Sequence, residues 1–134
     1  MLTEKDYCDY DTCVALKELG YKGTSRFFYA TKESPLRRYS YDQILTTRIA
    51  DAVGHTLAIS LYVAQKWLRE EKDIHLAVYY GKGRETNRVW VCNLVMENKV
   101  RQLTYEGVLV KTFSSYEEAL SEGIKEAIKI LKEE

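Results

Sequence analysis

Near residue 73 the apolar residues change their spacing, which limits the chain to folds that combine helices with strands. Before this point they recur at steps of three and four, the period of a helix with one buried face: Leu57, Leu61, Ala64, Trp67 and Leu68. This spacing predicts a helix over residues 57–72, with Thr56 able to cap its first turn. After it, apolar residues stand at alternate positions, which predicts a strand: Ile74, Leu76, Val78 and Tyr80.

Further stretches of strand character follow, and the connections between them are short. NRVWVCNLVM is a second strand, and GKGRETN, which supplies two glycines for a turn, joins it to the first. VRQLTY and VLVKTF come next, and Glu106 and Gly107 suit a tight turn between them. The sequence therefore predicts an antiparallel meander of three or four strands.

The C-terminal helix has the clearest signals. Ser115 and Glu118 form the S-x-x-E pattern of a capping box. The apolar residues that follow make one stripe: Ala119, Leu120, Ile124, Ala127, Ile128 and Leu131. Gly123 lies inside this helix, where glycine costs about 1 kcal/mol relative to alanine. We expect close packing of the helix against the sheet to compensate for that cost.

The N-terminal half carries weaker signals. A short helix is expected over residues 11–19, capped by Asp9 or Asp11 and ended by Gly20. Residues 25–31 are aromatic and favour a strand.

The segment that follows is the hardest to interpret. An exposed loop is expected around Pro35, and residues 44–53 favour a separate helix. The sequence leaves open whether residues 34–56 are helical or irregular. At 134 residues, we expect a single α+β domain over residues 1–134. Its order is α-β-α-β-β-β(-β)-α, with a short antiparallel meander and helices on one face.

Charge and cysteine content exclude several classes of protein. Lysine and arginine number 20 and aspartate and glutamate number 20, so the chain lacks the basic excess of proteins that coat nucleic acids. The three cysteines fit neither a zinc site nor a set of disulfides, so we expect no metal and a reducing cytoplasm. No apolar run is long enough to span a membrane, so we expect no membrane partner.

No pattern of catalytic residues stands out. The chain has no G-x-S-x-G, no P-loop and no H-E-x-x-H motif, and nothing places His55 or His75 beside a nucleophile. Cys13 and Cys92 fall in a predicted helix and a predicted strand, where a buried thiol acts as a small apolar group. We expect a protein that is not an enzyme and uses no cofactor; an enzyme of unrecognised type is an alternative.

Two stretches combine basic and aromatic side chains, which suit stacked, anionic ligands. In YYGKGRETNRVW, a hairpin tip carries the charges and its base carries the rings: Tyr79, Lys82, Arg84, Arg88 and Trp90. A strand follows this tip, so it lacks the helix N-terminus of a phosphate loop, and a merely soluble turn is the simpler alternative. The second stretch follows Pro35 and contains Arg37, Arg38, Tyr39 and Tyr41.

The stretches CVALKELGYKG, SLYVAQKWLREEKDIHLAVYY and FSSYEEALSEGIKEAIKIL cover roughly half of the chain. In this order they resemble elements of the types LAKEKGF, LLQKWLREVHNI and YEEALEEGLKEALKLI in small proteins of gut-bacterial genomes, prophages and phages. The resemblance carries over no catalytic residues. This chain has a longer middle segment, Ser34 to Thr56, where a function of its own would lie.

The resemblance implies a phage or mobile-element protein that binds a host component, with a role against host defence as one form. We therefore expect this chain to engage a host protein or an anionic, nucleotide-like small molecule. A nucleic-acid-binding module that uses the basic hairpin tip is the alternative. The exposed edge strand of a small meander also favours a homodimer.

Overall fold

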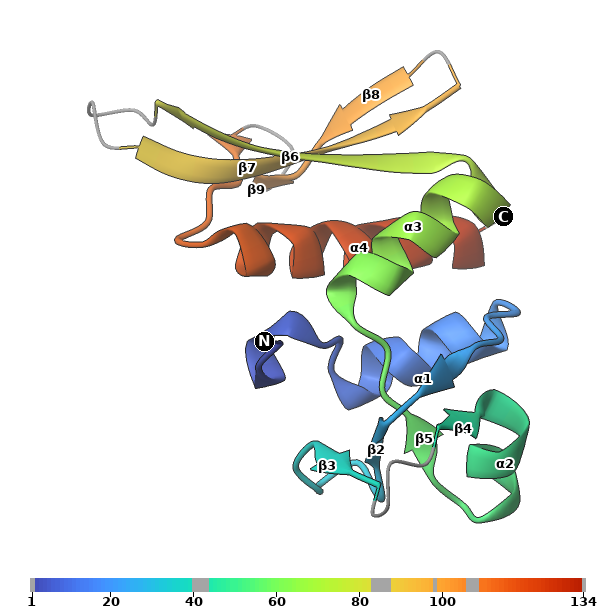
Figure 1. Ribbon diagram of the computed structural model, residues 1–134. Coiled ribbons are helices and arrows are strands. Elements are labelled where there is room, and N and C mark those ends of the chain that lie inside the picture. Colours follow the sequence, from blue (N-terminus) through green and yellow to red (C-terminus); the bar gives the residue numbers. More distant parts are fainter. Residues whose placement is uncertain (1, 40–43, 83–87, 98, 106–108, 134) are drawn as a thin grey trace. The chain divides into compact units, whose positions relative to one another are not determined.

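The chain divides into two compact units, Met1–Ala64 and Gln65–Glu134. They run from blue to green and from green to red in Figure 1, a computed structural model that describes residues 2–39, 44–82, 88–97, 99–105 and 109–133. Each unit has its own secondary structure and its own core. That residues 1–134 fold as one domain stays a prediction.

The N-terminal unit combines short helices with very short strands. Its helices are the 3-10 turn η1 (Glu4–Asp6), α1 (Tyr10–Glu18), α2 (Thr47–Ala52) and the first turn of α3 (Leu61–Lys72). Its strands are β1 (Thr24–Ser25), β2 (Phe27–Tyr29), β3 (Arg37–Arg38), β4 (Leu45–Thr46) and β5 (Thr56–Leu57). They pair antiparallel in the orders β1-β4 and β3-β2-β5.

Helix α1 begins and ends where local chemistry predicts. The side chain of Asp9 accepts a 2.8 Å hydrogen bond from the backbone N–H of Thr12, which makes Asp9 the N-cap. Gly20 follows the helix with φ of +106°, a conformation that glycine adopts without steric cost. The strand expected over residues 25–31 is shorter than predicted, because only Phe27–Tyr29 pair in β2.

The predicted start of the long helix is wrong. Thr56 and Leu57 lie in β5, opposite Tyr29 and Phe28 of β2, and α3 begins only at Leu61. Thr56 therefore cannot cap the helix, and Ser60 takes that role by accepting a 3.1 Å hydrogen bond from the backbone N–H of Val63. Leu57 is buried as a residue of strand β5, so its match to the helical spacing is a coincidence.

The described part of residues 34–56 is neither one helix nor an irregular loop. It contains β3, β4, α2 and β5, each only a few residues long. Arg37 and Arg38, expected in an exposed loop, pair with Phe28 and Phe27 as strand β3 and remain exposed. Tyr41 lies outside the described residues.

The C-terminal unit has the predicted α+β order. Its remaining elements are β6 (Ile74–Lys82), β7 (Arg88–Met96), β8 (Lys99–Gln102), β9 (Thr104–Tyr105), β10 (Leu109–Val110) and α4 (Tyr116–Lys132). The first three strands form the expected antiparallel meander β6-β7-β8, and β9 pairs with β10. The turn expected at Glu106 and Gly107 lies outside the described residues.

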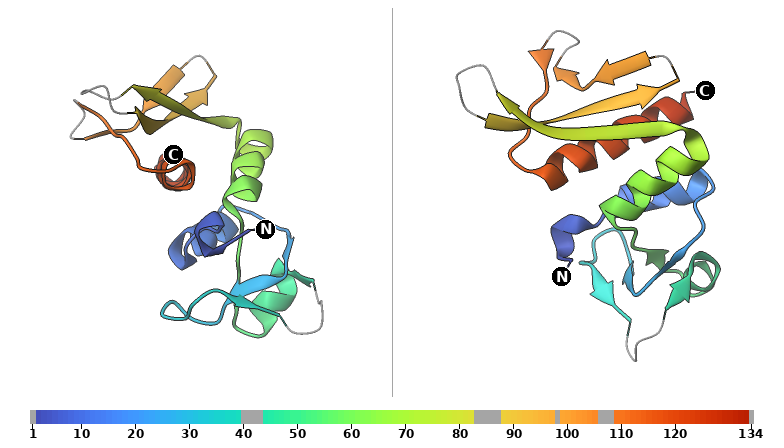
Figure 2. Two further views of the ribbon diagram at one scale, coloured as in Figure 1. Left: turned by 60° about the vertical axis from the view of Figure 1, so that its left-hand side comes forward. Right: turned by 45° about the horizontal axis from the view of Figure 1, so that its top comes forward.

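Helices cover one face of this meander, as predicted. Helix α4 packs along β6 and β7, and Gln65 of α3 donates a 3.0 Å hydrogen bond to the carbonyl oxygen of Leu76 in β6. Figures 1 and 2 show α4 beneath the sheet, with the opposite face of the sheet bare of helices in this unit. Ser115 caps α4 by accepting from Glu118 N, whereas the Glu118 carboxylate accepts from Ser114, so only half of the capping box forms.

The register of the hairpin decides which side chains share a face. Leu76 lies opposite Leu94, and Tyr80 lies opposite Trp90, all on the face that α4 covers. Tyr79 lies opposite Val91 on the other face. None of the described helices is long and apolar enough to cross a membrane.

Candidate functional site

The hairpin end of the C-terminal unit carries a cluster of rings beside one cation. The Tyr80 and Trp90 rings are 4.9 Å apart between centroids, and Tyr116 of α4 meets Trp90 edge-on at 5.5 Å. The Arg88 guanidinium lies 5.7 Å from the Tyr80 ring centroid, within cation–π range. Trp90 also exchanges two backbone hydrogen bonds with Phe113, so its ring and backbone both hold the unit together.

The structure brings together only part of the predicted hairpin site. Trp90 and Arg88 lie near Tyr80, which was not among the residues predicted for this site, whereas Tyr79 points to the opposite face. A strand reverses side-chain direction at each residue, so neighbouring tyrosines cannot share one ligand face. The side chain of Lys82 and the whole of Arg84 lie outside the described residues.

The second predicted stretch forms a more coherent face on the sheet β3-β2-β5. The Tyr39 ring stacks on Phe28 at 4.2 Å between centroids and 20° between planes. The His55 imidazole stacks on the same Phe28 ring at 4.4 Å and 19°. All three side chains are half-buried, so each ring is both held in place and reachable by solvent. We call Phe28, Tyr39 and His55 the ring cluster.

Arg37 adds a cation to the face that carries the ring cluster. It lies opposite Phe28 in the sheet and two positions before Tyr39, so the three side chains share one face. The side chain of Arg37 is exposed and forms no ion pair or hydrogen bond with any described residue. Arg38 lies opposite Phe27 on the other face, so the two arginines do not act together there.

Burial affects the acid–base chemistry of the ring cluster. It raises the pKa of Tyr39 above the ordinary value of 10.0, so the phenol stays neutral at physiological pH. The Tyr39 oxygen lies 3.5 Å from Nδ1 of His55, at the long limit of a hydrogen bond, so stacking on Phe28 is the main contact of both rings. The face therefore presents the neutral Tyr39 phenol, the Phe28 and His55 rings, and the positive charge of Arg37.

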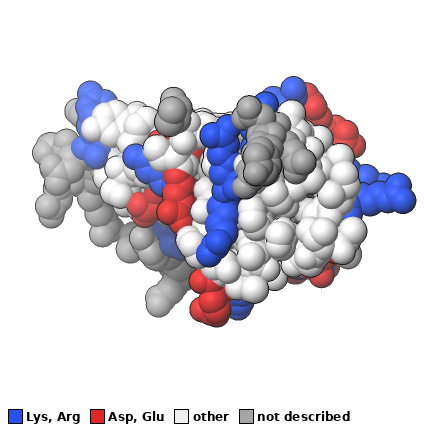
Figure 3. Space-filling model, turned by 60° about the horizontal axis from the view of Figure 1, so that its bottom comes forward, with Lys and Arg blue, Asp and Glu red and all other residues white. Residues whose placement is uncertain are grey.

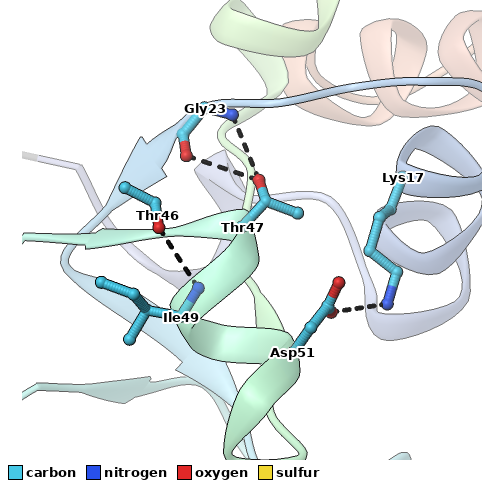
Figure 4. A network of polar contacts seen from close by, with 6 residues as sticks. All are labelled: Lys17, Gly23, Thr46, Thr47, Ile49 and Asp51. Atoms are coloured by element: carbon cyan, nitrogen blue, oxygen red, sulfur yellow. Dashed lines mark hydrogen bonds and ion pairs between the residues drawn. The ribbon is translucent and has the colours of Figure 1, made fainter.

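The same unit contains an open groove of about 1140 Å³, lined by residues 20–24 and 46–49 together with Lys17 and Asp51. Figure 4 shows that its polar groups bond to one another: Lys17 Nζ pairs with Asp51 Oδ1 at 2.8 Å, and Thr47 Oγ1 accepts from Gly23 N at 3.1 Å. These bonds tie α2 to α1 and to the strand β1. Lys17 is neutralised by Asp51, whereas Lys22 and Arg48 add two exposed cations to the lining. The groove differs from the face of Arg37 and the ring cluster, which we call the Arg37 face, in having no stacked rings among the described contacts.

Charge of both signs is spread over the face drawn in Figure 3. On the face drawn in Figure 3, basic and acidic residues lie beside one another between uncharged areas. Among the described residues, ion pairs join Lys17 to Asp51, Lys32 to Asp11, and Arg101 to Glu126. Among the described residues, no group of three or more metal-binding side chains is placed to hold an ion.

Two members of the Arg37 face were not selected from the sequence. Phe28 looked like an ordinary strand residue, and His55 lay next to a glycine with no visible partner. Only the pairing of β2 with β3 and β5 brings them to Tyr39. The chain matches no protein-family model, no curated protein and no solved structure.

Proposed function

We propose that the chain is a non-enzymatic binding protein that takes an anionic, nucleotide-like small molecule on the Arg37 face. The observation that supports this is the exposed Arg37 guanidinium, which no described residue neutralises, on the face of the ring cluster. A planar base would stack on the half-exposed rings, and a phosphate would accept from the guanidinium fork.

The chemistry of the face favours binding over catalysis. Its rings contact one another, and the His55 imidazole lies against the Phe28 ring and the Tyr39 phenol, with no described carboxylate or thiol beside it. The three cysteines are buried elsewhere in the chain, so none supplies a nucleophile to the face. The resemblance to phage and mobile-element proteins suggests a nucleotide signal of the host as the ligand, with a role against host defence.

The proposal is tested by calorimetric titration with three probes: ATP, adenosine and inorganic triphosphate. ATP should bind more tightly than adenosine, because only ATP offers phosphate to Arg37. Arg37→Gln should weaken ATP binding by tenfold or more, since a hydrogen bond to a charged group contributes about 1.5–3 kcal/mol. The same substitution should leave adenosine binding nearly unchanged, whereas Tyr39→Leu should weaken both.

Arg69→Gln on α3 is the matched control, because it removes the same charge from an exposed position in the other unit. ATP binding that survives Arg37→Gln, or falls equally in Arg69→Gln, would contradict the proposal. The triple change of Lys82, Arg84 and Arg88 to Ser tests the hairpin tip. A loss of binding to a single-stranded oligonucleotide in that variant, with a steep salt dependence, would favour the nucleic-acid alternative.

A further inference from the structure

Strand β6 lies at the margin of its sheet and leaves one long edge without a strand. The order is β6-β7-β8, so among the described residues β6 pairs with β7 alone. It has nine residues, Ile74–Lys82, and Figures 1 and 2 show it along the outer border of the meander. An edge of this length presents a row of backbone donors and acceptors.

The hydrogen bonds between Trp90 and Phe113 show which backbone groups of β6 point to this edge. Trp90 gives its N–H to Phe113 O at 3.0 Å and accepts from Phe113 N at 2.9 Å, on the side away from β6. Its partner Tyr80 is therefore in a non-hydrogen-bonded pair, and the N–H and C=O of Tyr80 point away from β7. Backbone groups reverse direction at each residue of a strand, so the N–H and C=O groups of Val78 and Leu76 also point away from β7.

A hydrogen bond from Gln65 supports this direction of the backbone groups, and it also shortens the part of the β6 edge that is free to pair. Its side chain donates to the carbonyl oxygen of Leu76 at 3.0 Å, as expected for a carbonyl that β7 does not use. That contact occupies the edge at Leu76. Val78 and Tyr80 lie beyond it, and no described residue forms a hydrogen bond with their outward N–H and C=O groups.

The edge has few of the features that prevent strands from pairing. Between Ile74 and Gly81 there is no proline, lysine, arginine or carboxylate. The one ionisable residue there, His75, contacts Asp73 at 2.9 Å. Tyr79 and Tyr80 are 43% and 50% exposed, one on each face of the strand, so apolar surface flanks the open backbone on both sides.

We propose that two copies of this chain pair antiparallel along β6, with the two-fold axis at Tyr79. Val78 then lies opposite Tyr80 of the second copy. The two-fold axis produces this pair twice, and each pair exchanges N–H···O bonds. Tyr79 faces its own copy in a non-hydrogen-bonded pair, where side chains come closest. The two meanders become one continuous sheet, and the symmetric interface closes on itself.

The register allows a second copy as the occupant without charge repulsion, and the short length of the pairing makes the dimer weak. With the axis at Tyr79, Lys82 lies opposite Leu76 of the second copy, so no like charges meet. A strand pairing of this length buries less than the roughly 800 Å² per partner of a standard interface. We therefore expect weak association, to which contact between the exposed tyrosine rings contributes.

Sedimentation equilibrium of the full chain over about 5–500 μM tests the proposal, because weak association is detected at micromolar to near-millimolar concentration. The wild-type chain should change from monomer to dimer. Tyr79→Lys and Tyr79→Glu should each remain monomeric, because like charges face each other at the axis. An equimolar mixture of the two variants should regain the dimer. Val100→Lys is the matched control, because it introduces the same charged side chain at an exposed position on the same sheet face in β8.

Dimer in the wild-type chain and in Val100→Lys, absent from both single Tyr79 variants and restored in their mixture, supports pairing along β6. Circular dichroism of each variant verifies that the monomers are folded. A wild-type chain that stays monomeric over the whole range overturns the proposal. So does a Tyr79→Lys dimer as strong as the wild type, or an equal loss of dimer in Val100→Lys.

Discussion

Gly123 of α4 lies directly against the sulfur of Cys92 in β7: a Cβ atom at position 123 would stand 2.5 Å from Sγ. The other nearby atoms would tolerate that Cβ, because Leu76 Cδ2 and the Cβ of Cys92 itself would lie at 3.5 and 3.6 Å, ordinary contact distances. Both residues are buried at the centre of the contact between helix and sheet. Glycine therefore allows α4 to approach β7, which compensates for its low helix propensity.

Gly123→Ala should destabilise the chain although alanine is the better helix former. Propensity alone predicts a gain of about 1 kcal/mol, but forcing a methyl group into this contact costs roughly 1–3 kcal/mol and should outweigh it. In a Cys92→Ala background the sulfur is gone, and the same substitution should be neutral or stabilising. Urea unfolding of the four proteins measures this coupling. A stabilising Gly123→Ala in the wild-type background would show that the helix moves away without cost.

Leu68→Ala should cost about 2–5 kcal/mol of unfolding free energy, because it removes a large side chain from a site with no solvent exposure. Lys66→Ala, two positions earlier on the exposed side of α3, is the control and should change stability by less than about 0.5 kcal/mol. Chemical denaturation of both variants gives the comparison. Equal effects would mean that the buried face of α3 is assigned incorrectly.

Acid should weaken the anchor between the N-terminal turn and α3. Asp6 Oδ2 accepts from Thr3 N, and Oδ1 accepts from the Tyr62 hydroxyl, both at 2.8 Å. The Thr3 backbone N–H first, and then Tyr62, lower the pKa of Asp6 below its ordinary 3.8. A lowered folded-state pKa gives stability that is present above the unfolded value and is lost as the pH falls through the folded value.

Asp6→Asn should therefore be less stable than the wild type at neutral pH, and the difference should shrink as the pH falls below about 3.8. Tyr62→Phe keeps the Thr3 bond and should show a smaller loss, of about 1 kcal/mol. Urea unfolding at several pH values measures both. A difference between the wild type and Asp6→Asn that grows on acidification would contradict the sign of this pKa shift.

The cysteines should be unreactive in the folded chain. All three are buried, and burial raises the pKa of Cys92 to about 11. The Cys13 side chain, together with burial, raises the pKa of Cys8. Ellman's reagent at mildly alkaline pH should react slowly with the native protein and rapidly with all three thiols in urea. A variant with alanine at the three positions, if folded, should keep its ATP affinity; a loss would instead indicate a thiol with a binding role.

Local sequence was sufficient for the elements whose signals repeat over several turns or alternations. Helix α4 follows from its apolar stripe and the serine at position 115, which caps the helix as predicted. Strand β6 follows from the alternation of apolar residues over positions 74–80, and β7 follows from the aromatic and β-branched residues of NRVWVCNLVM. The strands of the N-terminal unit have two or three residues, too few for a period of two to appear, so Thr56 and Leu57 were assigned to a helix.

The relation between distant residues was decided only by tertiary structure. The parity of the hairpin register places Tyr79 and Trp90 on opposite faces, although both looked like parts of one site. Phe28, Tyr39 and His55 become one cluster because three short strands pair, and the sequence between them carries no signal of that pairing. The spacing of apolar side chains reflects the local backbone conformation, so it can be seen within one segment. Strand pairing depends on hydrogen bonds between segments that are distant in the sequence, and no single segment contains that information.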